Sequence, residues 1–257
     1  MWNRGALKTK AKAALRETYW KAFLVSLVVA FIGGNGLPNF NIPFGNNLRN
    51  RSLNNPTPEM MKTMVFFVAL AIMGIIVILI FRILVGYALE IGGRRYFIGL
   101  AAGTSDMNEL SYSFTKTRYS SVLKTMLWRA FLNFLWYLLL FFPGIVKAYA
   151  YSMVPYILAE NPTIGRKRAI QLSVAMTRGE KFKMFVLDLS FIGWCLLGLL
   201  AFIVGMFFVL PYINATKAEL YLTLRSKALE TLLCTREELC DEEAYPDGVI
   251  DAEPEGV

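Results

Sequence analysis

The sequence predicts an all-α fold, a polytopic transmembrane helical bundle of about six spans with amphipathic interfacial helices. Two observations support this prediction. Of the 257 residues, 56% are apolar and 18% are charged, whereas soluble domains contain about 45–50% and about 25%. The apolar residues also come in long uninterrupted runs, which a soluble core does not need. We therefore expect a bilayer to shield many of these side chains.

The charges are divided unevenly along the chain. Nine of the 19 acidic residues lie beyond Arg236, and all 27 basic residues lie at or before it. A basic body on a membrane protein indicates segments that face the anionic lipids of the inner leaflet. We expect membrane lipids as partners and no nucleic acid, because no soluble basic surface remains outside these segments.

Three parts of the chain are expected to differ in character. Residues 1–21 contain a basic amphipathic helix that is predicted to lie at the cytoplasmic interface of the membrane. Residues 22–225 form the transmembrane bundle. Residues 226–257 form a cytoplasmic acidic tail, which is predicted to be disordered because it has few aromatic residues and many like charges.

The apolar runs define the expected spans. They lie at 22–32, 64–89, 122–142, 145–158, about 184–202 and about 204–224, and residues 35–61 form an external loop. Pro143-Gly144 is predicted to turn the chain between spans three and four. Asn161-Pro162 is predicted to start an amphipathic helix that ends near Gly179. The last block is split near Gly205; as one tilted span it would place the tail outside.

Basic residues indicate the orientation of the bundle. The expected cytoplasmic segments hold sixteen of them, and the expected external segments hold four. Because cytoplasmic loops carry an excess of Lys and Arg, this ratio predicts a multi-pass protein of the plasma membrane with a cytoplasmic N-terminus.

Several motifs in the second half of the chain are shared with a known family. They are the stretch 143–158, Asn161-Pro162, the stretch 187–194 and Pro211-Tyr212. With these motifs the sequence resembles, over about residues 1–225, an uncharacterised family of integral membrane proteins of Gram-positive bacteria, domain of unknown function 975. It is also distantly similar to the membrane domain of some glycerophosphodiester phosphodiesterases. The resemblance implies a multi-span bundle in the plasma membrane and carries over no catalytic residue.

Residue types that most catalytic sites need are missing from this sequence. It has no histidine, and therefore no Ser-His-Asp triad and no zinc helix built from histidines. It has no Gly-rich nucleotide loop ending in Lys-Ser or Lys-Thr, and its three cysteines have neither disulfide nor zinc spacing. We expect a protein that is not an enzyme and that uses no cofactor or metal.

Four ionisable residues interrupt the predicted spans and form a candidate intramembrane polar cluster: Arg82, Lys124, Arg129 and Asp188. Each costs about 2.5–3.5 kcal/mol at a bilayer centre, so each needs a physical reason. One interpretation is that the long basic side chains reach the headgroups and Asp188 stays hydrated. The other is that Asp188 pairs with Arg129 or Arg82 around a wet, inward-facing cavity.

The hydroxyl groups of several tyrosines are expected to point into the bundle beside prolines that kink the spans. These tyrosines are Tyr149, Tyr151, Tyr156 and Tyr212. Together with the polar cluster they favour a non-enzymatic membrane module that binds or moves a lipid, peptide or hydrophobic solute. The alternative is a scaffold or regulatory partner of another membrane protein complex, which would use the acidic tail and the basic helices as its binding surfaces.

Overall fold

A computed structural model describes residues 3–33, 58–104, 106–200 and 204–239, and these residues are helical or lie in short connections. The predicted all-α class is confirmed for this part of the chain. Its helices are α1 (Arg4–Gly33), α2 (Pro58–Phe81), the π-helix η1 (Arg82–Gly86), α3 (Tyr87–Ala101), the 3₁₀-helix η2 (Met107–Phe114), α4 (Lys116–Leu139), α5 (Phe141–Ala150), α6 (Val154–Glu160), α7 (Arg166–Met176), α8 (Lys181–Leu200), α9 (Val204–Glu230) and α10 (Arg236–Leu239). The expected external loop 35–61 lies mostly outside the described residues.

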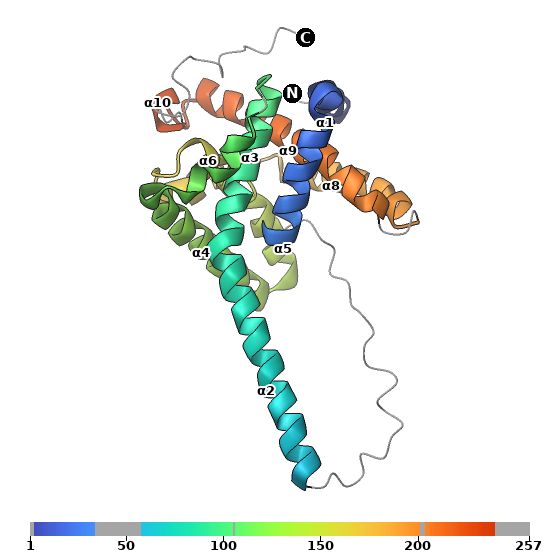
Figure 1. Cartoon of the computed structure of the whole chain (residues 1–257). Helices are drawn as coiled ribbons and strands as arrows, with labels where there is room; N and C mark the ends of the chain where they lie inside the picture. Colours follow the sequence, from blue (N-terminus) through green and yellow to red (C-terminus); the bar gives the residue numbers. More distant parts are fainter. Residues whose placement is uncertain (1–2, 34–57, 105, 201–203, 240–257) are drawn as a thin grey trace.

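The longest helical rod of the molecule consists of α2, η1 and α3, which follow one another without a break. Figure 1 shows α3 inside the body and α2 extending away from it. The large apolar side chains of α2 from Met64 to Phe81 are exposed, and almost all of α3 is buried. The π-helix lies at the boundary between these two environments, and such turns insert one extra residue into an α-helix.

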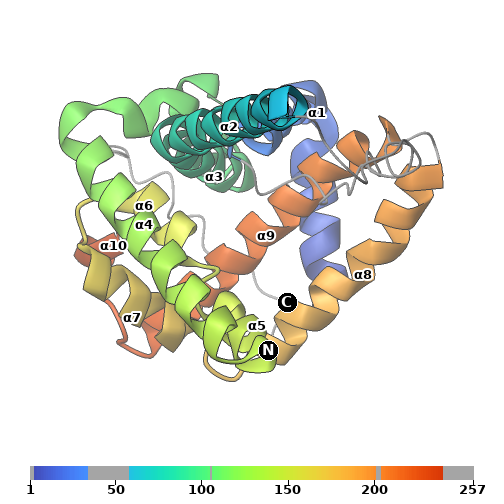
Figure 2. The ribbon, with the colours of Figure 1, turned by 90° about the horizontal axis from the view of Figure 1, so that it is seen from below.

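Helices α1, α3 and α9 form the centre of the body, and Figure 2 shows α9 running obliquely across it toward α8. Leu7, Ala11 and Leu15 recur on one face of α1 and are buried in the shared core. This is the predicted amphipathic helix, and its apolar face packs against the bundle. The regular helical backbone of α1 is interrupted at Thr18, where the chain bends.

Two adjacent glycines let α3 approach its neighbours closely. A side-chain carbon on Gly92 would overlap the backbone of Leu110 in η2, and one on Gly93 would overlap Val29 in α1. Small residues at these positions are therefore required for the observed helix separations, as in other tightly packed helical bundles.

The region of the predicted fourth span differs from expectation. Pro143-Gly144 lies inside α5, and the predicted turn is found three residues earlier, at the extended residue Leu140 between α4 and α5. The chain breaks again at residues 151–153, between α5 and α6. Pro155 occupies the first turn of α6, where its missing N–H costs no hydrogen bond. The two helices have ten and seven residues, and each is too short to cross a bilayer, which needs about 20.

Helix α7 also begins later than predicted. Asn161 caps a turn by accepting a hydrogen bond from the Thr163 amide, and the helix starts only after Gly165, whose φ is +84°. The predicted stop at Gly179 is confirmed, because the residue adopts a φ of +81° that favours glycine. The divided last block is confirmed too, since α8 ends at Leu200 and α9 begins at Val204.

One helix of the described residues is long and apolar enough to cross a membrane, the continuous stretch Met61–Ala101. Its most apolar part is not buried by the rest of the chain. The apolar segment of α1, Thr18–Val29, is shorter, and α4 carries Lys124 and Arg129 within its length. The structure thus supports one candidate span by length and composition, and the six predicted spans are not supported by this criterion.

The beginning of the predicted acidic tail is folded. Helix α9 continues to Glu230, and the side chains of Cys234 and Leu239 are buried in the core. The prediction of disorder is therefore wrong for residues 226–239, and for residues 240–257 it lies outside the described part of the chain.

Candidate functional site

A cavity of about 240 Å³ lies among α3, α4, α5, α6, α8 and α9. Its wall contains two acidic and three basic side chains, together with hydroxyl groups of Tyr149, Ser152 and Tyr156. The charged members are Glu90, Arg94, Arg129, Asp188 and Lys217. Apolar side chains such as Met184 and Leu187 complete the wall. Such a mixture is typical of a binding cavity, where apolar surface gives contact and a few polar groups give orientation.

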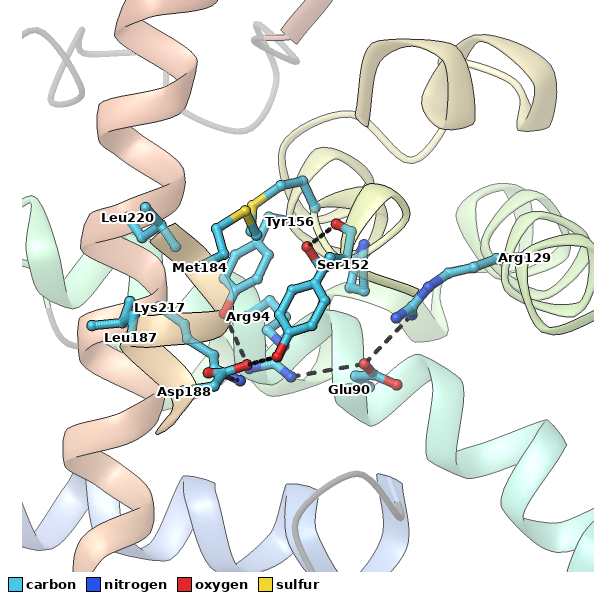
Figure 3. Close-up of a pocket in the computed structure, with 13 residues that line it drawn as sticks. Glu90, Arg94, Arg129, Ser152, Tyr156, Met184, Leu187, Asp188, Lys217 and Leu220 are labelled. Carbon is cyan, nitrogen blue, oxygen red and sulfur yellow. Dashed lines mark hydrogen bonds and ion pairs between the residues drawn. The ribbon is translucent and has the colours of Figure 1, made fainter. Parts of the chain in front are cut away.

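Glu90 lies between two arginines (Figure 3), and its side chain is only 1% exposed. One carboxylate oxygen, Oε1, is 3.8 Å from a terminal nitrogen of Arg94 and 3.9 Å from one of Arg129. These separations are too long for hydrogen bonds. Both Glu90 oxygens are buried without a hydrogen-bond partner among the described residues. Burying a carboxylate in this way is costly, which is why such groups are found at functional sites more often than in ordinary cores.

Arg94 fixes the position of α3 relative to α6 and α9. Its guanidinium group donates to the hydroxyl of Tyr156 at 3.1 Å and to the side-chain carbonyl of Asn214 at 3.0 Å. The Asn214 amide in turn donates to the hydroxyl of Ser26 in α1 at 3.1 Å. Arg94 is therefore held in place by the helices around it.

Asp188 forms the other end of the cavity with partners from two helices. Its carboxylate is 3.1 Å from the ammonium group of Lys217 in α9, and it accepts a 3.1 Å hydrogen bond from the Tyr149 hydroxyl in α5. Figure 3 shows Asp188 and Lys217 on the side of Arg94 opposite to Glu90 and Arg129. This pair of opposite charges is neutral and satisfied within itself.

Arg129 is the least satisfied cation of the cavity wall. Besides the distant Glu90 carboxylate, the one polar contact of its guanidinium group with a described residue is the sulfur of Met126, at 3.9 Å. Its Nε atom is buried without a partner among the described residues, and so is the side-chain carbonyl of Asn133, one helical turn along α4. Arg129 can therefore offer a fork of N–H donors to a molecule in the cavity.

A second buried network lies behind Tyr156. The Tyr156 ring stacks on Tyr221, whose hydroxyl donates a 2.5 Å hydrogen bond to the Glu160 carboxylate. Arg225 is 3.3 Å from the same oxygen of Glu160, so the buried carboxylate has both a donor and a counter-ion. This network joins α6 to α9 and supports one wall of the cavity.

The C-terminal segment is fastened to α7 by a set of contacts that we call the C-terminal clasp. The guanidinium group of Arg168 binds both carboxylate oxygens of Glu238 and the carbonyl of Leu233, and the Asn161 amide donates to the Glu238 carbonyl. The hydrogen bonds from Arg168 hold the pKa of the Glu238 carboxyl below its usual value. The clasp keeps Cys234 and Leu239 buried.

The structure brings together two of the four residues of the predicted polar cluster. Arg129 and Asp188 line the cavity, but they do not pair with each other, and Asp188 binds Lys217. Arg82 and Lys124 are exposed residues of η1 and α4 that do not line it. The interpretation in which Asp188 pairs with Arg129 or Arg82 is not supported, because the partners of Asp188 among the described residues are Lys217 and Tyr149.

Glu90 and Arg94 were not predicted as site residues. The apolar run that indicates a span ends at Leu89, and both residues follow it directly. A signal was available, because Glu90 and Arg94 are four residues apart and so share one face of any helix that continues past Leu89. The tyrosine prediction is confirmed for Tyr149 and Tyr156, which both line the cavity.

The described residues contain no group of three His, Cys, Asp or Glu side chains that could hold a metal ion. The cavity can hold a polar or charged group by hydrogen bonds and ion pairs, with its tyrosine and arginine side chains as donors. No step of covalent chemistry follows from this arrangement.

The comparisons with known proteins identify one family. A search of curated proteins gave no significant match, and neither did a search of solved structures. The similarity to glycerophosphodiester phosphodiesterases is not shown by any of these comparisons. Residues 138–228, which contain α5 to α8 and most of α9, match the model of the family described as protein of unknown function (DUF975). The predicted resemblance to this family is thereby confirmed for residues 138–228.

Proposed function

We propose that this chain is a multi-pass protein of the plasma membrane that binds or moves a lipid, peptide or hydrophobic solute and catalyses no reaction. The observation that carries the proposal is the cavity, where five ionisable side chains converge from four helices. One of these helices, α3, continues the exposed apolar helix α2. A buried cluster of this kind is costly unless a bound polar group compensates it, so it indicates a binding site.

The exposed surface supports a membrane setting for this proposal. Side chains of α2 are apolar around the whole helix and lack cover from the rest of the chain, and exposed apolar side chains also crowd the end of α4. The members on α4 and its connection to α5 are Phe131, Phe134, Leu135, Leu138, Leu139 and Leu140. A soluble monomer rarely exposes so much contiguous apolar surface, whereas lipid tails accommodate it.

In the proposed topology, helices besides the stretch Met61–Ala101 also cross the membrane. Helix α4 has 24 residues and α8 has 20, which correspond to about 36 Å and about 30 Å and match a hydrocarbon core of about 30 Å. In the proposed arrangement α5 and α6 together take the place of the fourth span. The excess of basic residues in the predicted cytoplasmic segments supports a cytoplasmic N-terminus.

The proposal is tested by an Asp188→Asn variant purified in mild detergent. The substitution removes the charge that compensates Lys217 but keeps an acceptor for Tyr149. Because Lys217 is then uncompensated, we expect the amounts of the lipids or solutes that co-purify to differ from those of the wild-type protein at normal expression, as measured by mass spectrometry.

Asp106→Asn is the matched control for this test. Asp106 is exposed and caps η2 through the Asn108 amide, a role that Asn also performs. We expect it to retain the bound molecules. If Asp188→Asn and the wild-type protein retain the same molecules in equal amounts, the cavity is not the binding site.

A second candidate function is a scaffold or regulatory partner of another membrane protein complex. It is favoured by the exposed basic side chains of Lys10, Lys12 and Arg16 on α1. The acidic residues after 240 would provide a further binding surface. Deleting 241–257 tests it without cutting the C-terminal clasp, since Glu238 stays in place. Loss of partner proteins in a pull-down would support this function, and unchanged partners would contradict it.

A further inference from the structure

The charges around the cavity do not balance. Three cations and two anions line it, which leaves a net charge of +1. Asp188 and Lys217 neutralise each other at 3.1 Å. The excess charge therefore lies among Glu90, Arg94 and Arg129, where one carboxylate faces two guanidinium groups.

Arg129 is the cation on which this excess falls. Arg94 is compensated by the oxygens of Tyr156 and Asn214 as well as by Glu90. Arg129 makes no hydrogen bond to an oxygen atom of any described residue, and its side chain is 19% exposed. A guanidinium group in this state lacks the paired oxygen acceptors that match its planar fork of donors.

Glu90 adds a second, independent indication of a bound molecule. Its two oxygens are buried, line the cavity wall and accept no hydrogen bond from a described residue. They need donors, and donors other than the two distant arginines must come from a molecule inside the cavity. A ligand that combines a negative charge with a hydroxyl group or similar donor satisfies Arg129 and Glu90 together.

We propose that the cavity binds a singly charged oxyanion that carries a hydrogen-bond donor, with Arg129 holding the anionic oxygens and Glu90 accepting from the donor. One negative charge neutralises the cavity, whereas a dianion would reverse its sign beside the Glu90 carboxylate. The inference rests on the proposed function and narrows its ligand class. The oxyanion comes either from the phosphodiester headgroup of an anionic lipid or from a small free acid.

The test compares lipids of different headgroup charge on the purified full-length protein. Nanodiscs or detergent micelles contain either phosphatidylglycerol, a monoanion with hydroxyl groups, or phosphatidylcholine, which has no net charge and no hydrogen-bond donor in its headgroup. Native mass spectrometry measures lipid retention, and isothermal titration with glycolate measures the binding of a free hydroxy acid. We expect the wild-type protein to prefer phosphatidylglycerol or to bind glycolate.

Two variants and one control make the test specific for Arg129. Arg129→Gln removes the fork and the charge, and we expect about a tenfold or greater loss of anion binding. Arg129→Lys keeps the charge, so it should fold more readily than Arg129→Gln. It should still bind the anion more weakly than the wild-type protein, because lysine lacks the planar fork of donors. Lys124→Gln removes one positive charge from an exposed position on the same helix and should bind like the wild-type protein.

Each outcome distinguishes this inference from the proposed function. Binding of glycolate but not of phosphatidylglycerol, with the same dependence on Arg129, supports the oxyanion site and assigns it to a free acid. Equal retention of both lipids with no effect of either Arg129 variant overturns the inference and leaves the proposed function intact. Absence of any bound lipid or solute in the wild-type protein contradicts the proposed function itself.

Discussion

The two halves of the long helix Met61–Ala101 have opposite relations to the rest of the molecule. The first half, in α2, is apolar on all sides and is not covered by other described residues. The second half, α3, carries Glu90, Arg94 and Arg95 and is almost entirely buried. In this fold the protein encloses its polar helix and leaves its apolar helix to the surroundings. Hydrophobicity in this rod therefore does not indicate membership of the protein core, and in the proposed membrane setting it indicates contact with lipid.

The largest expected effect comes from removing the buried carboxylate of α3. Glu90→Ala leaves Arg94 and Arg129 without their common counter-ion, and it should lower the free energy of unfolding by about 3–5 kcal/mol. Glu59→Ala is the matched control at the far end of the same rod. Glu59 pairs with Lys62, and its side chain is 81% exposed, so we expect its unfolding midpoint to stay at the wild-type value. If denaturant titrations give both variants the same loss in free energy of unfolding, the buried carboxylate of α3 does not contribute more to stability than the exposed one of α2.

A charge placed in α2 tests whether its surroundings are lipid. Ile76→Lys should raise the free energy of membrane insertion by about 2.5–3.5 kcal/mol, measured with a glycosylation-based insertion assay of the full chain. Met61→Lys, at the start of the stretch, should insert normally because a lysine there reaches the headgroups. Normal insertion of Ile76→Lys would argue against α2 as a membrane span.

Glycine substitutions compare packing in the two halves. Gly92→Ala in α3 would force its new methyl group against the backbone of Leu110, and we expect a loss of about 1–3 kcal/mol in stability. Gly74→Ala in α2 meets no atom within 4 Å and should be neutral or stabilise the helix by up to about 1 kcal/mol. Thermal unfolding of both variants measures the difference. A harmless Gly92→Ala would show that η2 does not pack as closely as described.

The smallest expected effect is a pH dependence of the C-terminal clasp. The side chain of its carboxylate, Glu238, is less exposed than that of Glu59 and more exposed than that of Glu90. Arg168 lowers the pKa of Glu238 below the usual value of 4.5. The stability that this pair provides is therefore fully present above pH 4.5 and is lost as the pH falls through the lowered pKa.

Thiol labelling of Cys234 reports on the clasp, because this side chain is buried beneath it. The measurement uses a variant in which Cys195 and Cys240 are replaced by serine, so that only Cys234 reacts. After the labelling rate is corrected for the falling fraction of thiolate, we expect it to rise as the pH falls below 4.5. Arg168→Gln should make labelling fast and remove this pH dependence. Slow labelling of Arg168→Gln at all pH values would show that the clasp does not protect the thiol.

The sequence predicts local features of this protein better than contacts between distant residues. The all-α class, the helix stop at Gly179 and the two helices of the last apolar block follow from hydrophobic runs and breaker residues. The partner of Asp188 does not, because Lys217 reaches it only through the packing of α8 against α9. Composition also cannot show that the helix continues past Leu89, since the charges that end the apolar run are sheltered by other helices. The motif Pro143-Gly144 predicts the turn between α4 and α5 a few residues too late, because proline is compatible with the first turn of α5 and the turn lies before it, at Leu140.

The π-helix Arg82–Gly86 has a consequence for how the chain tolerates insertions and deletions. One residue of an α-helix corresponds to about 100° of rotation and about 1.5 Å of length. Deleting one residue such as Val85 would remove the extra residue of this wide turn and leave a regular α-helix. An insertion or deletion that the turn does not absorb would instead rotate α2 about its own axis relative to α3. Most helices would then present the wrong side to their neighbours. Because α2 is apolar around its whole circumference, any rotation presents an apolar face. Residues can therefore be inserted or deleted at η1 without changing how the cavity residues are arranged.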